Sequence, residues 1–244
     1  MKYEGMVFST HNYGDLIVTE YVNSRNVCVK FVETGYETFA TIGNIRNGNI
    51  KDRLQPTVCG VGVVGNESSE VDGVRLKEYD LWLAMIHRCY GKKSHNSSYK
   101  DCSVSENFKY YPYFKEWCNK QVGFNQDGWC LDKDILIKGN RIYGEHVCVF
   151  VPNEVNLLTV KCDNKRGEYV IGTSYRKKYK KFAANLSIGG KQTHIGHFDT
   201  ELEAFMAYKN EKETYIIETV TKWKDQIDPR VYEALVNYQV EITD

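Results

Sequence analysis

The stretch Phe182–Tyr215 places the strongest constraint on what this chain can fold into. The pair Gly189–Gly190 divides two β-rich segments, and glycine supplies the positive φ angles of a tight hairpin turn. Thr200 or Asp199 can cap a helix, and Glu203 lies three residues beyond Thr200, as in a capping box. A further β-rich segment, GTSYR, comes before the hairpin. The sequence therefore predicts a three-stranded sheet with one packed helix in residues 168–244, followed by a tail of two short helices and a last strand.

Lysine and arginine are concentrated around the same segment, although the whole chain is electrically balanced. It has 32 Lys and Arg against 32 Asp and Glu, so any basic surface is local. Only Asp163 and Glu168 oppose the basic residues of this span, which are Lys161, Lys165, Arg166, Arg176, Lys177, Lys178, Lys180, Lys181 and Lys191. A cation at a phosphate releases counterions, and lysine suits backbone contacts better than base reading. We expect the segment to grip a nucleic-acid backbone; the alternative is a solvated edge that prevents strand pairing.

Composition sets the outer bounds. A chain of 244 residues with 42% hydrophobic and 26% charged residues indicates two or three small globular domains. The N-terminus lacks the apolar stretch of a secretory leader, so the eight cysteines are expected to be reduced, cytoplasmic and packed in cores. No CxxC pair occurs, which argues against a zinc ribbon. No run reaches the ~20 apolar residues of a membrane span. We expect a soluble protein without a membrane partner.

Residues 1–68 carry short strand patterns separated by turn residues, at residues 15–22, 26–33 and 36–42. Val27, Val29 and Phe31 alternate with Cys28 and Lys30, which indicates a sheet with one buried face. The segment is expected to form a small five-stranded barrel that resembles the Src-homology-3-like barrels of ribosomal and chromatin proteins. Its role is either to brace the neighbouring domain or to dock nucleic acid or protein. An apolar strand at residues 58–64 and a polar boundary at residues 66–73 follow.

Two helices are expected next, at residues 78–91 and 105–124, with Pro112 in a first turn or at a break. Aromatic residues recur at helical spacing in the second, and they either pack in a core or stack on bases; they are Phe108, Tyr111, Phe114 and Trp117.

Residues 128–158 read as a strand, a polar turn, a second strand and a helix that begins at Pro152 and Asn153. The linked motifs YDLWLAMIHRCY, SVSENF, LDKDI, GNRIY and VCVFVPNEVN resemble phage-encoded proteins related to HNH homing endonucleases. Members carry a ββα core followed by an Apetala-two-like, or integrase-N-terminal-like, DNA-binding module. The resemblance covers about residues 75–244 and implies an α+β architecture in three pieces. They are a barrel at residues 1–68, a degenerate HNH-like ββα domain at residues 74–162 and an Apetala-two-like domain at residues 168–244.

The resemblance also implies positions for a nuclease centre. Asp132 falls where a metal-binding carboxylate lies, Lys133 where the general base lies, Asn140 at the orienting asparagine and Asn156 at the helix ligand. A lysine with its usual pKa carries a proton and cannot accept one from water unless burial lowers that pKa by several units. His146 lies nearby in sequence as a substitute base. We expect cleavage to be lost or weak, with no cofactor, or Mg²⁺ if the centre is active.

A structural role is the alternative for these carboxylates. Asp132 and Asp134 can cap the turn or pair with Lys133 and Lys138. The sequence leaves both interpretations open.

In Apetala-two-like modules the outer sheet face enters the major groove, and matching positions here are candidate contacts. They are Arg176, Lys178, Lys180, Asn185, Lys191, Gln192 and His194 from the resemblance, and Lys165, Arg166, Lys177 and Lys181 from their charge.

Three functions follow as expectations. The first is a phage-type nucleic-acid-binding protein derived from an HNH homing endonuclease, acting in host takeover in an infected bacterial cell. The second is a protein that binds structured RNA or a ribonucleoprotein such as the ribosome, because an RNA partner is read by shape and phosphates. The third is an active metal-dependent HNH endonuclease, which requires His146 or Lys133 to act as base.

Overall fold

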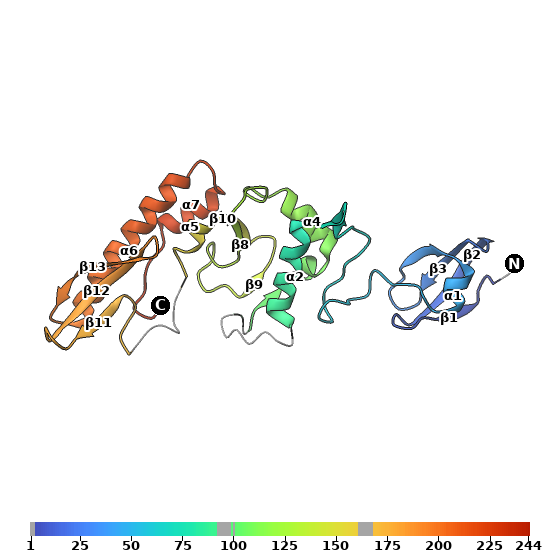
Figure 1. Ribbon diagram of the computed structural model, residues 1–244, viewed down its shortest axis with the longest axis horizontal. Coiled ribbons are helices and arrows are strands. Elements are labelled where there is room, and N and C mark those ends of the chain that lie inside the picture. The colour runs from blue at the N-terminus through green and yellow to red at the C-terminus, as the bar shows by residue number, and fades with distance from the viewer. Residues whose placement is uncertain (1–2, 92–98, 100, 161–167) are drawn as a thin grey trace. The chain divides into compact units, whose positions relative to one another are not determined.

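The computed structural model describes residues 3–91, 99, 101–160 and 168–244 and shows a mixed α+β protein with several small sheets (Figure 1). The chain forms two compact units, residues 1–117 and 118–244. The expected ββα domain at 74–162 spans this division, and the three-domain boundaries stay a prediction. No helix in the described residues is both long and apolar enough to cross a membrane.

The described residues of the first unit form seven strands and four helices. They are β1 (Val7–Ser9), β2 (Asp15–Asn23), β3 (Asn26–Phe31), β4 (Glu37–Ala40), β5 (Glu70–Val71), β6 (Val74–Arg75), β7 (Ser103–Val104), α1 (Ile42–Arg46), α2 (Lys77–Tyr90), α3 (Glu106–Lys109) and α4 (Tyr111–Asn119). The division between the two units falls within α4.

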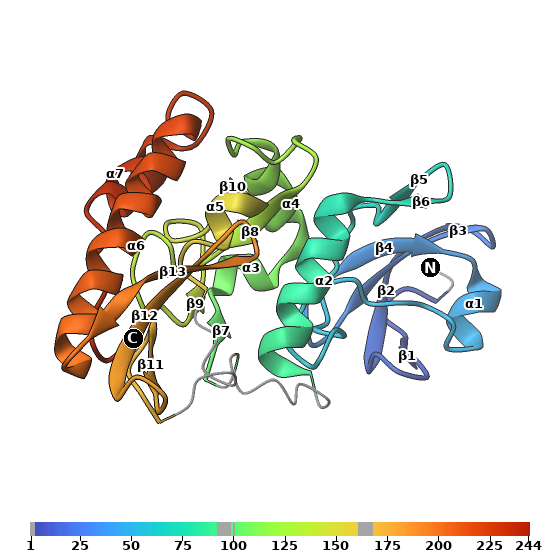
Figure 2. The ribbon, with the colours of Figure 1, turned by 60° about the vertical axis from the view of Figure 1, so that its left-hand side comes forward.

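Strands β1 to β4 form an antiparallel meander, visible in the blue part of the ribbon (Figure 2). The predicted alternation is confirmed, because Val27, Val29 and Phe31 are fully buried. The expected closed barrel is not formed in the described residues. After β4 the chain enters α1, where the Thr41 hydroxyl accepts a hydrogen bond from the Asn44 amide at 3.2 Å. A closing strand is thus replaced by a capped helix whose buried Ile45 fills the core.

The helices of the first unit pack through aromatic side chains. Trp82 of α2 is fully buried and donates from Nε1 to the Phe108 carbonyl oxygen at 2.8 Å. The aromatic run of α3 and α4 is buried as well, which confirms its core role, and Pro112 stands in the first turn of α4. The prediction of a strand at residues 58–64 is wrong. The chain makes a tight turn there, with Val58 bridged to Gly62.

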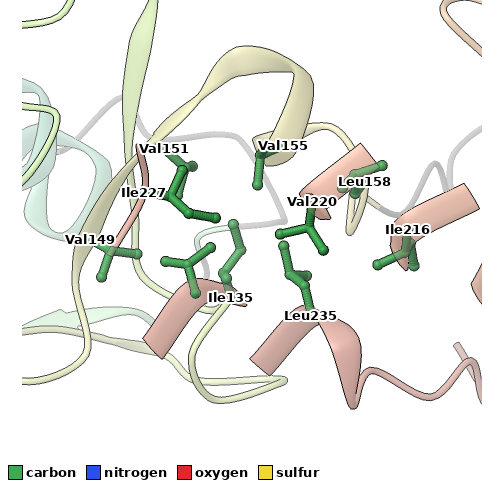
Figure 3. Packing of buried hydrophobic residues seen from close by; sticks show 10 residues of the cluster. Ile135, Val149, Val151, Val155, Leu158, Ile216, Val220, Ile227 and Leu235 are labelled. Carbon is green, nitrogen blue, oxygen red and sulfur yellow. The ribbon is translucent and has the colours of Figure 1, made fainter. Parts of the chain in front are cut away.

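The second unit contains β8 (Trp129–Asp132), β9 (Ile142–Tyr143), β10 (Val149–Pro152), β11 (Thr173–Arg176), β12 (Lys181–Ile188), β13 (Lys191–Phe198), α5 (Asn153–Asn156), α6 (Glu201–Trp223) and α7 (Pro229–Val236). Strands β8 and β10 are antiparallel, and α5 follows β10 directly. Their apolar side chains meet those of α6 and α7 in one cluster, which includes Val151, Val155, Val220 and Leu235 (Figure 3).

Strands β11, β12 and β13 form an antiparallel sheet, and α6 runs along one face of it (Figure 1). The predicted hairpin is confirmed, since Gly189 and Gly190 have φ angles of +56° and +80°. The predicted capping box is also present. The Thr200 hydroxyl accepts from the Glu203 amide at 3.2 Å, and the Glu203 carboxylate accepts from the Thr200 amide at 3.0 Å.

The C-terminal segment departs from the expected last strand. The Glu213 carboxylate of α6 accepts a hydrogen bond from the Val240 amide at 2.8 Å, and Lys209 Nζ donates to the Val240 carbonyl oxygen at 2.7 Å. Two side chains of α6 thus satisfy the Val240 amide and carbonyl groups, which would otherwise pair with a neighbouring strand.

We predict that Gly172→Ala destabilises the protein strongly. Gly172 precedes β11 with a φ of +77°, and a Cβ there would lie 2.1 Å from the Tyr208 ring of α6. Overpacking and the left-handed backbone together should cost about 3 kcal/mol or more in the free energy of unfolding, measured by urea denaturation. Gly128→Ala is the matched control, because Gly128 has a φ of +73° and open space around its Cα. It should lose only about 1 kcal/mol, and equal losses would contradict the packing argument.

Candidate nucleic-acid interface and ββα site

The outer face of the β11–β13 sheet is defined by strand register. Leu186 and Ala184 are buried against α6, so the alternate residues of β12 face away from the helix. Cross-strand partners share a face, which places Asn185 beside His194 and Ser187 beside Gln192 on the outer side. The predicted contacts Asn185, Gln192 and His194 therefore share one face of the sheet.

A β-bulge adds a residue to this face that strand alternation misses. His194 pairs with Asn185, but Gly196 pairs with Ala184, so Ile195 is the extra residue. The shift brings His197, opposite Ala183, onto the same side as His194. Counting by two from His194 gives residues 196 and 198, and the sequence has no local signal for the bulge. His197 is thus a candidate contact that the sequence alone does not indicate.

These residues form a connected polar row. Asn185 Oδ1 can only accept, so His194 Nδ1 donates to it at 3.2 Å. His194 Nε2 and His197 Nδ1 share a second hydrogen bond at 3.3 Å. The Tyr179 ring lies 5.0 Å from the His197 ring, measured between centroids. The row presents exposed imidazole and phenol groups in fixed orientations.

The cations lie around this row. The turn between β11 and β12 carries Lys177, Lys178 and Lys180, all exposed, and Lys178 Nζ lies 5.3 Å from the Tyr179 ring centroid. Lys181 is the exception, because its Nζ forms an ion pair with Asp199 at 3.1 Å. Within the described part of the chain, no ion pair engages the remaining cations of the sheet, which are Arg176, Lys177, Lys178, Lys180 and Lys191.

One predicted contact stands apart from the outer face, and two cannot be placed. Lys191 pairs with Ile188, on the side of the sheet that carries Leu186, so register places it on the helix side of the hairpin. Lys165 and Arg166 lie outside the described residues.

In the ββα segment, Asp132 ends β8 and caps the turn that follows. Its Oδ1 accepts from the Asp134 amide at 2.8 Å and from the Ile135 amide at 2.7 Å. Burial raises the pKa of Asp132 to about 6, and the neighbouring Asp134 carboxylate acts in the same direction. These are the contacts expected for the structural alternative, in which Asp132 caps the turn.

Lys133 is buried and its ammonium group is occupied. Its Nζ donates to Asp134 Oδ2 at 2.9 Å and to the Asn140 carbonyl oxygen at 3.2 Å. Asn140 in turn donates from Nδ2 to the carbonyl oxygens of Lys133 at 2.6 Å and Ile142 at 2.7 Å. The structure thus brings Asp132, Lys133 and Asn140 into one closed loop. The expected pairing of Lys138 is wrong, since Lys138 Nζ binds Asp244 Oδ2 at 2.7 Å.

His146 and Asn156 have no recorded contact with that loop. The His146 side chain is exposed, and its carbonyl oxygen accepts from Arg230 of α7 at 3.3 Å. Asn156 ends α5 and is partly buried. No group of three or more His, Cys, Asp or Glu side chains suited to a metal occurs among the residues that the structure covers.

Comparisons with protein-family models, with curated proteins and with solved structures gave no match to this chain.

We predict that Asp132→Asn removes a pH-dependent part of the stability. The pKa of Asp132 is raised in the folded state, so its contribution is complete below the unfolded value of 3.8 and is lost as pH rises through about 6. In urea denaturation from pH 4 to pH 7, the wild-type protein should lose about 1 to 3 kcal/mol relative to Asp132→Asn. Asp127→Asn, which changes an exposed aspartate, is the control. Parallel curves for wild type and Asp132→Asn would contradict the expectation.

Proposed function

We propose that this chain is a nucleic-acid-binding protein that grips phosphates with the outer face of the β11–β13 sheet and the turn at residues 177–180. The observation that carries the proposal is the set of exposed cations without ion pairs around an ordered polar row. Lysine and arginine side chains that are not paired with carboxylates can neutralise phosphates. The nucleic acid then releases its bound counterions, which drives association at low salt.

The charge distribution of the second unit supports this orientation. Residues 168–198 contain six lysines and arginines and one acidic residue, Glu168. Residues 199–244 contain eleven acidic and five basic residues, and exposed Glu203, Glu211 and Glu218 belong to α6, on the other side of the sheet. A polyanion is attracted to the sheet and repelled by the helix, so it should approach from the outer face.

We further propose that the protein derives from an HNH homing endonuclease of phage type, with a degenerate cleavage centre, and that it acts in an infected bacterial cell. In this proposal residues 74–162 are the ββα domain and residues 168–244 are the Apetala-two-like module. The β1–β4 meander is taken as an open relative of Src-homology-3-like barrels. The chemistry at the loop supports weak or absent cleavage. Asp132 Oδ1 is engaged by two turn amides, and Lys133 Nζ donates to Asp134 and to a carbonyl oxygen, so Lys133 is not placed to take a proton from water.

Structured RNA, alone or in a ribonucleoprotein such as the ribosome, is the second candidate partner. Of the six cations in residues 168–198 only Arg176 is an arginine. Lysines contact phosphates as point charges and lack the planar guanidinium fork that reads guanine edges. Phosphate contacts of this kind are sufficient for a protein that recognises RNA by its shape.

The partner is tested by pull-down of the full chain from infected and uninfected bacterial lysate, followed by sequencing of the recovered DNA and RNA. Enrichment of duplex DNA supports the homing-endonuclease lineage, and enrichment of structured RNA supports the second candidate. Recovery of neither above a mock purification would contradict nucleic-acid binding. Plasmid nicking that requires Mg²⁺ would show that the third expectation, an active endonuclease, is correct.

We predict that Lys178→Glu combined with Lys180→Glu weakens binding about 100-fold at low salt, because phosphate contacts are replaced by repulsion. The slope of log affinity against log salt should fall by about two. Fluorescence anisotropy with duplex DNA and with structured RNA measures both quantities, and circular dichroism checks folding.

Lys222→Glu combined with Lys224→Glu is the matched control, because it makes the same charge change at exposed positions at the end of α6. The control should bind nearly as wild type. Equal weakening in both double variants would mean that only net charge matters, and unchanged affinity in the first would refute the proposed surface.

A further inference from the structure

We propose that Cys59 is a reactive thiol, with His87 as its proton acceptor, and that it forms mixed disulfides with low-molecular-weight disulfides. This inference concerns the first unit and is independent of nucleic-acid binding. Cys59 Sγ lies 3.3 Å from His87 Nδ1. A thiol beside an imidazole nitrogen is the arrangement that activates cysteine nucleophiles, since the thiolate is the attacking species.

The backbone holds the thiol in this position. Cys59 has a φ of +52°, a conformation that L-residues rarely adopt, and the turn around it is closed by two hydrogen bonds. The amides of Val61 and Gly62 both donate to the Val58 carbonyl oxygen, at 3.1 and 2.8 Å. A non-glycine residue keeps such a backbone only where the surrounding structure enforces it.

Helix α2 supports the turn and also carries the base, His87. A Cβ at Gly62 would lie 3.0 Å from the ring of Trp82, which is fully buried in α2, so the turn rests directly on the helix. His87 stands in the last turn of the same helix, where its carbonyl oxygen accepts from the Gly91 amide at 3.0 Å. The turn that carries the thiol therefore packs on the helix that carries the imidazole.

Access distinguishes Cys59 from the buried cysteines, although Cys28 and Cys89 are partly exposed as well. Cys102, Cys118 and Cys148 are buried, and burial raises the pKa of the Cys148 thiol to about 12. Cys59 is partly exposed and His87 is exposed, so a small disulfide can reach the pair. Cys130 is partly exposed as well, but its recorded neighbour at 3.8 Å is Asn153 Oδ1, an amide oxygen that does not act as a base.

The reaction conserves atoms and electrons. His87 Nδ1 takes the proton of the Cys59 thiol, and the thiolate attacks one sulfur of a disulfide RSSR. The S–S bond of RSSR breaks as the new bond between Cys59 and SR forms, and RS⁻ leaves and takes the proton from the imidazolium. Cysteine is oxidised to a mixed disulfide, and half of RSSR is reduced to RSH.

The test follows glutathionylation of the full chain by glutathione disulfide, quantified at each cysteine by mass spectrometry between pH 6.5 and 9. Cys59 should react about tenfold or more faster than Cys130 at pH 7, where an unassisted thiol is only a few per cent ionised. His87→Gln should remove this advantage. It should also restore the steep rise of rate with pH of an ordinary thiol, whose pKa is about 8.5.

His11→Gln is the matched control, since it removes an exposed histidine of the same unit. It should leave the Cys59 rate unchanged, and melting curves should show that both variants stay folded. The proposal would be overturned by a Cys59 rate no higher than that of Cys130, or by a rate and pH profile that His87→Gln leaves unaltered.

Discussion

The second unit depends on one helix that belongs to two hydrophobic cores. Near its N-terminus, α6 buries Ala204 and Phe205 against the β11–β13 sheet, and farther along it buries Ile216 and Val220 against β8, β10, α5 and α7. Tyr215 contacts both clusters. At about 1.5 Å per residue, the 23 residues of α6 form a rod about 35 Å long. The basic sheet and the ββ loop are thus attached to a common support, and the capping box fixes where that support begins.

Features encoded by neighbouring residues could be predicted from the sequence. The glycine hairpin, the Thr200–Glu203 box and the alternation around Val29 each depend on a few adjacent side chains, and all were found as expected. Closure of the N-terminal sheet into a barrel depends instead on a fifth strand after β4, and the chain forms helix α1 there. The bulge at Ile195 is likewise imposed by pairing with β12 rather than by local preference. Reasoning from the sequence identified most of the basic surface but missed the histidine that the bulge adds to it.

The ββα site illustrates a second limit. The motif LDKDI indicated which residues gather, and Asp132, Lys133 and Asn140 do share a loop. Their contacts could not be read from the sequence, because either a catalytic or a capping role uses the same residue types. The structure adds the capping contacts, in which Asp132 Oδ1 accepts from two backbone amides. Cys59 and His87 had no motif to link them, because they lie 28 residues apart and meet only through the turn on α2.

The sharing of α6 between two cores has an evolutionary consequence. A substitution that loosens the packing of β8 and β10 also exposes apolar surface of the helix that supports the sheet. Selection for the sheet alone would therefore maintain the interior of the ββα segment, whatever chemistry that segment performs. Polar loop residues such as Lys133 and Asn140, in contrast, are not part of this apolar cluster, although Ile135 of the same loop is. Under this constraint a lineage can lose an activity at a loop within a few substitutions and still inherit the intact scaffold beneath it.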